Sequence, residues 1–354
     1  MAIVSTSQLK PGDSIQDNVM TTRGNLLMEK GRMLTPREIA ILQAFLIPNV
    51  SIVSKEDIAA ADPAAQPPIM EPVETAFYEE YQRMLVFLKK VFAQVKAGQP
   101  FPILEIRLNL EKLIGLIDEY NILAMTSFQS EESDYPYHNS LLVALTSYKL
   151  AGWSGFPVKD WIPVALGGLF HDIGNSKVDP VIFEKKTRLT ESEMEEMRKH
   201  TIYGYQFLKN VPAINEGVKL CALQHHEKED GSGYPLKTKG DKIHPYAKIV
   251  AIADMFHAMT SNRAHKKAAS PYLVLEELLL ESFGKLEPTL VQTFINRVTS
   301  FHNGTLVRLS DNRIGEIVFS DRNHPTRPWV NVEGSILNLS IERRIHIKEV
   351  VASS

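Results

Sequence analysis

The sequence predicts a mainly α-helical protein with a small α+β unit at its amino end and a small β unit at its carboxyl end. Apolar residues recur at helical spacing between about 73 and 301, which is typical of packed amphipathic helices. Short β-prone runs separated by turn residues fill the chain beyond 304. Alanine and proline dominate 59–72, as in a linker. The 354 residues suffice for two or three domains.

The predicted amino-terminal unit covers residues 1–54. Its clearest signal is the run Thr35-Pro36-Arg37-Glu38, which has a capping residue, a proline at the first helical position and a glutamate at the third. We expect a helix from there to about Phe45, then a strand at Val50–Val53. Residues 55–72 are the predicted linker to the next domain.

The predicted central domain, residues 73–301, contains helices and no strand, because no segment within it alternates convincingly between apolar and polar residues. The expected helices cover 73–96, 102–118, 136–151, 161–171, 190–209, 213–226, 245–261, 271–282 and 288–301. Residues 302–354 form the predicted carboxyl-terminal β unit. Its expected strands are Thr305–Leu309, Gly315–Phe319, Trp329–Val332 and Arg344–Val350.

Composition excludes several classes of protein. The net charge of −3 produces no overall positive field, so we expect no binding to nucleic acid polymers. Cys221 is the only cysteine, which excludes an intramolecular disulfide and a cysteine-ligated zinc site. No apolar run approaches the ~20 residues that span a bilayer, and the amino end does not read as a signal peptide. We therefore expect a cytoplasmic protein without a membrane anchor.

The central domain carries a set of histidine and carboxylate side chains that could bind metal ions. No histidine occurs before His138, and all 11 lie between it and His346. A mixed nitrogen and oxygen ligand set without thiolate suits Mn, Fe, Zn or Ni. Eight candidates exceed what one ion needs, so two or more ions are expected. The candidates are Asp134, His138, His171, Asp172, His200, His225, His226 and Asp254.

Several of these candidates have a local reason to be ligands. Asp134 and His138 are four residues apart and share a helical face, although Asp134 could instead cap the helix that Pro136 begins. The pair His171-Asp172 ends an apolar segment, where an unpaired aspartate is costly. Asp254 lies in the middle of an apolar helix, a position that normally requires a cation.

The order of these residues resembles the HD-GYP domain, a branch of the HD phosphohydrolase superfamily. The resemblance covers about residues 125–300 and rests on a series of motifs. They are His138, His171-Asp172-Ile173-Gly174, His200, His225-His226-Glu227, Asp230-Gly231-Ser232-Gly233-Tyr234-Pro235, Asp254, Thr260-Ser261, Arg263 and Lys266.

The resemblance implies an HD-type helical bundle and an enzyme that hydrolyses cyclic di-GMP to pGpG, and further to GMP in some members. A hydroxide bridging two or three divalent ions, commonly Fe or Mn, is the implied nucleophile. Asp172 would bridge the ions, and Asp134 would help to hold a third. Arg263 and Lys266 fall where basic residues bind the substrate phosphates. Tyr234 and Pro235 belong to the signature loop beside the substrate.

Two positions depart from the family pattern. Asn175 stands where a lysine is usual, and His257 stands where an aspartate is usual. Of the two, only His257 could transfer a proton, so we assign it a catalytic role beside Asp172. These departures leave two alternatives open: an impaired domain that senses cyclic di-GMP or docks a partner, and a phosphohydrolase of another nucleotide. The terminal units could mediate a homodimer or contact a signalling protein.

Overall fold

The computed structural model describes residues 2–20, 26–28, 30, 32, 34–35, 38–39, 42, 47–53, 75–125, 134–183, 185, 187–262, 268–300, 304–321 and 323–352. The chain divides into two compact units, Met1–Val73 and Glu74–Ser354. Among the described residues, no helix combines the length and the apolar character needed to cross a membrane.

The amino-terminal unit contains two small antiparallel sheets. Strand β5 (Asn49–Val53) pairs with β1 (Ala2–Ser5) on one side and with β2 (Ser14–Ile15) on the other, while β3 (Val19–Met20) pairs with β4 (Leu26–Met28). The predicted strand at 50–53 is confirmed by β5. Residues 38, 39 and 42 of the predicted helix are helical, but most of that helix and the predicted linker lie outside the described residues.

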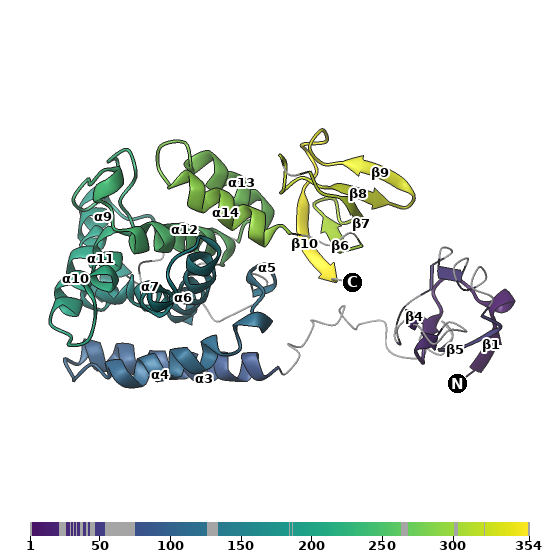
Figure 1. Ribbon diagram of the computed structural model, residues 1–354, viewed down its shortest axis with the longest axis horizontal. Helices are drawn as coiled ribbons and strands as arrows, with labels where there is room; N and C mark the ends of the chain where they lie inside the picture. Colours follow the sequence, from purple (N-terminus) through teal and green to yellow (C-terminus); the bar gives the residue numbers. More distant parts are fainter. Residues whose placement is uncertain are drawn as a thin grey trace. The chain divides into compact units, whose positions relative to one another are not determined.

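The second unit confirms the mainly helical fold class (Figure 1). Most of its α-helices occupy the predicted segments with shifts at their ends, but the short helices at 122–125 and 180–183 were not predicted, and short 3-10 turns connect some of the helices. The α-helices are α3 (Ala76–Lys96), α4 (Ile103–Ile114), α5 (Ile122–Met125), α6 (Tyr135–Trp153), α7 (Val158–Phe170), α8 (Pro180–Phe183), α9 (Glu191–Arg198), α10 (His200–Lys209), α11 (Glu216–Gln224), α12 (Pro245–Thr260), α13 (Pro271–Glu281) and α14 (Pro288–Val298).

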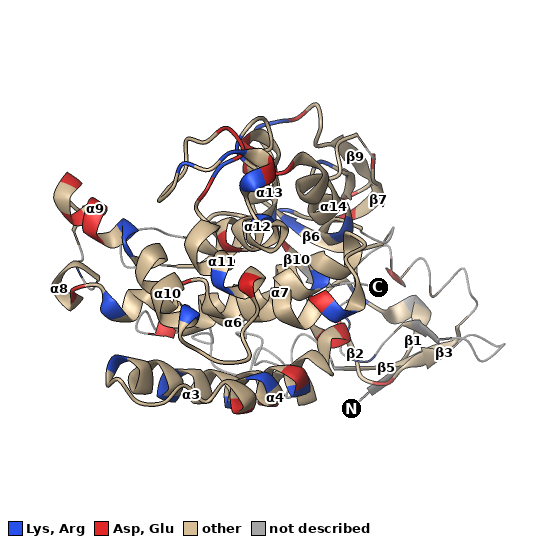
Figure 2. Cartoon of the chain, turned by 60° about the vertical axis from the view of Figure 1, so that its left-hand side comes forward, with Lys and Arg blue, Asp and Glu red and all other residues tan. Residues whose placement is uncertain are grey.

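Helix α6 lies at the centre of the bundle, and twelve of its residues are buried. It packs closely on α7 because α7 has glycines at the contact. A Cβ atom on Gly168 would lie 2.9 Å from the carbonyl oxygen of Val143, and one on Gly167 would lie 2.5 Å from Sγ of Cys221. Cys221 is a free cysteine buried in this core. Charged side chains instead follow the outer helices α3, α4 and α9 (Figure 2).

One predicted helix, 190–209, is two helices in the structure, α9 and α10, which meet at a turn at Lys199. Side chains of the second helix bind carbonyl groups at the end of the first. His200 Nδ1 lies 2.7 Å from the carbonyl oxygen of Met197, and the Thr201 hydroxyl donates to that of Arg198 over 3.0 Å. Such side-chain hydrogen bonds compete with the backbone hydrogen bonds of the helix, and the helix is interrupted here.

The carboxyl-terminal residues form a five-stranded antiparallel sheet in the order β10-β6-β7-β8-β9. The strands are β6 (Leu306–Leu309), β7 (Ile314–Phe319), β8 (Trp329–Val332), β9 (Ser335–Asn338) and β10 (Ile347–Ala352). The strand β9 was not among the predicted ones. Residues 335–338 lack a clear alternation and pair only with β8 at the sheet edge.

This sheet belongs to the same compact unit as the helices, so the predicted boundary at 301–302 marks a change of secondary structure within one unit. Figure 1 shows the sheet beside α13 and α14. Tyr272 of α13 is part of the apolar core of the sheet. The Arg327 guanidinium donates to Glu276 of α13, with Nη2 2.8 Å from Oε2. Ser270 donates its hydroxyl to the carbonyl of Ile347 over 2.7 Å.

Candidate metal centre

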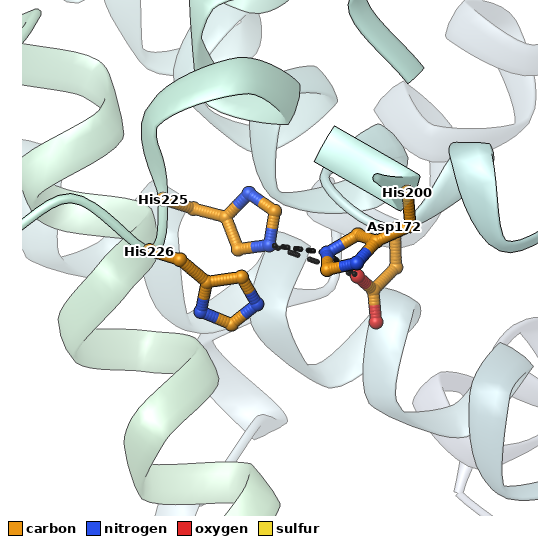
Figure 3. Close-up of side chains that lie close together, drawn as sticks. All are labelled: Asp172, His200, His225 and His226. Carbon is orange, nitrogen blue, oxygen red and sulfur yellow. Dashed lines mark hydrogen bonds and ion pairs between the residues drawn. The ribbon is translucent and has the colours of Figure 1, made fainter. Parts of the chain in front are cut away.

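Four side chains from separate elements converge in the helical bundle: Asp172, His200, His225 and His226 (Figure 3). One ligand atom from each lies within 4.8 Å of the others. Asp172 directly follows the end of α7, His200 begins α10, and the two adjacent histidines follow α11. The helix ends therefore bring together residues that are up to 54 positions apart (226 − 172).

The Asp172 carboxylate is the hub of this cluster. Its Oδ1 atom lies 3.3 Å from Nε2 of His200 and 3.7 Å from Nε2 of His225. The two imidazole Nε2 atoms are themselves 3.4 Å apart. Nitrogen and oxygen ligand atoms thus face one another across a small volume, which is the arrangement that a bound cation would require.

The other ring nitrogen of each histidine shows why these atoms face inward. His200 Nδ1 lies 2.7 Å from the carbonyl oxygen of Met197, and His225 Nδ1 lies 2.9 Å from that of Cys221. His171 Nδ1 lies 2.7 Å from the carbonyl oxygen of Gly168. A carbonyl only accepts hydrogen bonds, so each Nδ1 carries a proton and Nε2 is the ring nitrogen that faces the cluster. Such backbone contacts orient metal-ligating histidines and fix their tautomer.

A second carboxylate, Asp254 of α12, adjoins the cluster through His171. The fully buried Nε2 of His171 lies 3.3 Å from Oδ1 of Asp254 and 3.5 Å from Oδ2 of Asp172. Burial by itself would lower the pKa of His171, but the two carboxylates outweigh it and raise that pKa to about 9. Asn139 also donates to Asp254 over 3.1 Å. The two partly buried carboxylates therefore need a positive charge between them.

The residue set fits a divalent metal on its own chemistry. The neutral imidazole of His200 and the two carboxylates direct lone pairs at one region, and Nε2 of His171 has no hydrogen-bond partner of good geometry among the described residues. Without a cation, these lone pairs repel one another. A divalent ion would convert the repulsion into coordination.

Gly174 permits the backbone approach that joins two of the ligands. The 3-10 turn Ile173–Lys177 follows Asp172 and packs directly on α10. A Cβ atom on Gly174 would lie 1.9 Å from the carbonyl oxygen of His200. No larger residue fits there without moving Asp172 away from His200.

Glu227 holds the signature loop against the centre. Its carboxylate accepts the backbone N–H groups of Leu236 and Thr238, over 2.6 and 2.9 Å. The Tyr234 ring stacks on His226 with ring centroids 4.7 Å apart, and the Arg198 guanidinium lies 5.3 Å from the centroid of the Tyr234 ring. Neither Glu227 nor Arg198 was among the predicted site residues, although Glu227 is part of the motif. A role in holding a loop leaves no separate signal in the sequence.

The structure places Asp134 and His138 beside α3, outside the four-residue cluster. Asp134 forms an ion pair with Lys89 over 2.6 Å, and His138 Nδ1 lies 2.9 Å from the Tyr81 hydroxyl. Asp134 is at the first position before α6 but makes no capping hydrogen bond with its side chain. The helix-cap alternative for Asp134 is therefore wrong, and the Lys89 ammonium provides the charge that balances it.

The position of His257 in the structure bears on its predicted role in proton transfer. Its ring is fully buried, and Nε2 lies 2.7 Å from the Thr146 hydroxyl, which in turn lies 2.8 Å from that of Tyr120. Burial lowers the pKa of His257 to about 3. An imidazole with that pKa is neutral near pH 7 and has no proton to give as an acid. The expectation that His257 acts in proton transfer does not agree with this position in the core.

The remaining predicted residues have mixed outcomes. Arg263 and Lys266 lie outside the described residues. Pro235 follows Tyr234 through a cis peptide bond in the signature loop. Asn175 lies in the turn after Asp172, and its Oδ1 is buried without a hydrogen-bond partner among the described residues.

Fold and site together define a helical domain with a histidine and aspartate cluster that fits a divalent metal ion. Residues 122–289 match the family model described as "HD domain". This part of the chain matches the HD domain family, and it carries the motifs His171-Asp172 and Gly233-Tyr234-Pro235 on which the resemblance to the HD-GYP branch rests. Bd1817 of Bdellovibrio bacteriovorus, described as an HDG"Y"P protein, has a related fold. It has a TM-score of 0.52 and 17% identity, covering 83% of this chain and 97% of that one.

Curated relatives are named as phosphodiesterases of cyclic dinucleotides. The cyclic di-GMP phosphodiesterase PA4108 of Pseudomonas aeruginosa is 24% identical over 89% of this chain and 81% of its own. A cyclic di-GMP phosphodiesterase of Thermotoga maritima is 34% identical over 50% of this chain and 48% of its own. The 3'3'-cGAMP-specific phosphodiesterase 2 of Vibrio cholerae is 32% identical, but the match covers 45% of this chain and 31% of that protein.

Proposed function

We propose that the protein is a metal-dependent phosphodiesterase that hydrolyses cyclic di-GMP to pGpG and then to GMP. One observation carries the proposal. Three histidines, each fixed by a backbone carbonyl at Nδ1, present Nε2 to the partly buried Asp172 and Asp254 carboxylates. The names of the relatives supply the class of substrate.

The proposed cofactor is a set of two or three divalent ions, Fe or Mn. Asp172, His200, His225 and His226 would hold them, with His171 and Asp254 completing the set. Asp134 and His138, which contact Lys89 through Oδ2 and the Tyr81 hydroxyl through Nδ1, are the proposed ligands of a third ion. When bound, the ions would lower the pKa of water so that hydroxide forms near neutral pH and attacks phosphorus.

The protein's own side chains would bind and orient the substrate. The Tyr234 ring, which stacks on His226, is proposed to stack also on a guanine base of the substrate. Arg263 and Lys266 are proposed to bind phosphate oxygens, by analogy with the family. Glu227 would keep the loop in position through its two backbone hydrogen bonds.

A turnover assay with metal analysis on the same sample tests this proposal. Full-length protein is loaded with Mn(II), or with Fe(II) under reducing conditions, and the products from cyclic di-GMP are separated by chromatography. We expect pGpG, and no product from Asp172→Asn prepared in the same way. A fully loaded protein that binds cyclic di-GMP but releases no product would favour the sensor alternative instead.

The substrate 3'3'-cGAMP is a second candidate because several Vibrio cholerae relatives are named as specific for it. Both compounds contain two phosphodiesters in a ring, and they differ in one base. The same assay with 3'3'-cGAMP as a parallel substrate separates the two. A larger kcat/KM for 3'3'-cGAMP would reassign the substrate without changing the chemistry.

The amino-terminal unit, Met1–Val73, is proposed to mediate a homodimer or to bind a signalling partner. Removing this unit should then change the oligomeric state or the specific activity. Light scattering and the turnover assay measure these two properties, and no change in either would contradict the role.

A further inference from the structure

A cavity of about 850 Å³ lies where the helical bundle meets the carboxyl-terminal sheet. Its volume is in the range of ligand pockets, ~300–1,000 Å³. Both parts of the unit line it. Tyr81, His138 and Asn262 come from the helical part, and Ser310, His346 and Lys348 come from the sheet. The sheet therefore contributes polar groups to a pocket that the helical domain alone would leave open.

The cavity borders the metal centre through α6. His138 lines the cavity, and its neighbour Asn139 donates a hydrogen bond to Asp254 over 3.1 Å. None of the four clustered ligands lines the cavity itself. The metal centre and the cavity thus lie beside the same turn of α6, as two parts of a larger site would.

Lys348 on β10 is an available cation in this cavity. It is exposed and makes no ion pair among the described residues. Its neighbour Glu349, which also lines the cavity, is already paired with Arg308 over 2.6 Å. His346 adds no charge, because burial and the nearby Arg327 lower its pKa. The Lys348 ammonium is therefore free to meet an anionic group.

A cyclic dinucleotide has two phosphates, and only the one being cleaved can occupy the metal centre. The other phosphate keeps its negative charge and needs a cation or hydrogen-bond donors elsewhere. We propose that Lys348 binds this second phosphate, so that the carboxyl-terminal sheet completes the substrate site. This inference rests on the proposed function, because it takes a cyclic dinucleotide as the ligand.

Equilibrium dialysis of a hydrolysis-resistant phosphorothioate analogue of cyclic di-GMP against the metal-loaded full-length protein tests the inference separately from turnover. We expect Lys348→Ala to raise Kd about tenfold, the loss of one charge-assisted contact. Lys348→Arg should retain most of the affinity, because it keeps the charge. Arg343→Ala is the matched control, since Arg343 is an exposed cation of the same sheet region that does not line the cavity.

A second substrate isolates the role of the second phosphate. Bis(p-nitrophenyl) phosphate has a single phosphodiester, so Lys348→Ala should leave its hydrolysis unchanged while raising KM for cyclic di-GMP. An unchanged Kd in Lys348→Ala, or no binding by the wild type, would overturn the inference. If the wild type binds through Lys348 but releases no product, the inference stands and the proposed hydrolysis fails.

Discussion

The Nε2 atom of His200 lies 3.3 Å from the Oδ1 atom of Asp172, and neither the neutral imidazole with its proton on Nδ1 nor the ionised carboxylate can donate a hydrogen across this contact. The His200 proton is on Nδ1, which lies 2.7 Å from the Met197 carbonyl oxygen. Two lone pairs therefore face each other in a buried site. A contact of this kind is stable only with a cation between or beside the two atoms.

Asp172→Asn should remove most of the bound metal and of the activity. The amide is isosteric with the carboxylate but lacks the negative charge that faces three imidazoles. We expect metal content to fall below one ion per chain and turnover to fall by at least ~100-fold, because the nucleophile depends on the metal. Plasma emission spectroscopy measures the metal content, and the turnover assay measures the activity. Full metal content in this variant would show that Asp172 is not a ligand.

Gly174→Ala should destabilise the fold and weaken metal binding together. Its Cβ atom would lie 1.9 Å from the His200 carbonyl oxygen, so the turn after Asp172 must move away from α10. Overpacking of this kind costs about 1–3 kcal/mol of unfolding free energy. Urea unfolding and a metal titration measure the effects.

Gly98→Ala is the control for that experiment, since a Cβ atom there meets nothing within 4 Å. Its positive φ of 70° makes alanine unfavourable by about 1 kcal/mol, but the site is far along the chain from the ligands. Metal affinity should therefore change only in Gly174→Ala. Equal metal affinity in both variants would contradict the packing role of Gly174.

The buried His257 should make the fold less stable in mild acid. Burial lowers its pKa in the folded state from 6.5 to about 3, so it stays neutral there while the unfolded chain takes up a proton. This contribution is present in full above pH 6.5 and is lost as the pH falls from 6.5 towards 3. For one such group, the free energy of unfolding falls by about 1.4 kcal/mol for each pH unit in this range.

Comparison with His257→Gln isolates this effect, because the other histidines titrate in both proteins. Between pH 7 and pH 5, the wild type should lose about 2 kcal/mol more unfolding free energy than the variant. Urea unfolding at a series of pH values measures the difference. If the unfolding free energies of the two proteins changed in parallel with pH, the pKa of His257 would be the same in the folded and the unfolded chain. A role for His257 in proton transfer would then be open again.

Arg327 should be needed to hold the carboxyl-terminal sheet on α13. Its guanidinium donates to both carboxylate oxygens of Glu276 and to the carbonyl of Ile345. Lysine cannot reproduce this planar set of donors, so Arg327→Lys should lose nearly as much stability as Arg327→Ala, about 1–3 kcal/mol. Thermal unfolding measures the loss, and limited proteolysis should release the sheet sooner. Wild-type stability in Arg327→Lys would show that charge alone suffices.

The sequence by itself determined the class of fold and the identity of the ligands. Helical periodicity predicted the bundle between 73 and 301, because one apolar stripe per helix must be buried. The motifs His171-Asp172 and His225-His226 marked side chains that the structure then places around Asp172. Local rules suffice for these features, since periodicity, caps and motif spacing are properties of neighbouring residues.

Only the tertiary structure decided which residues meet. It separated Asp134 and His138 from the cluster, because Lys89 and Tyr81 of α3 bind them, and it placed His257 in the core. It also joined the sheet to α13 and brought Lys348 to a cavity that His138 lines from the helical part. Contacts between residues hundreds of positions apart depend on how helices and sheet pack, and no local pattern in the chain records that packing.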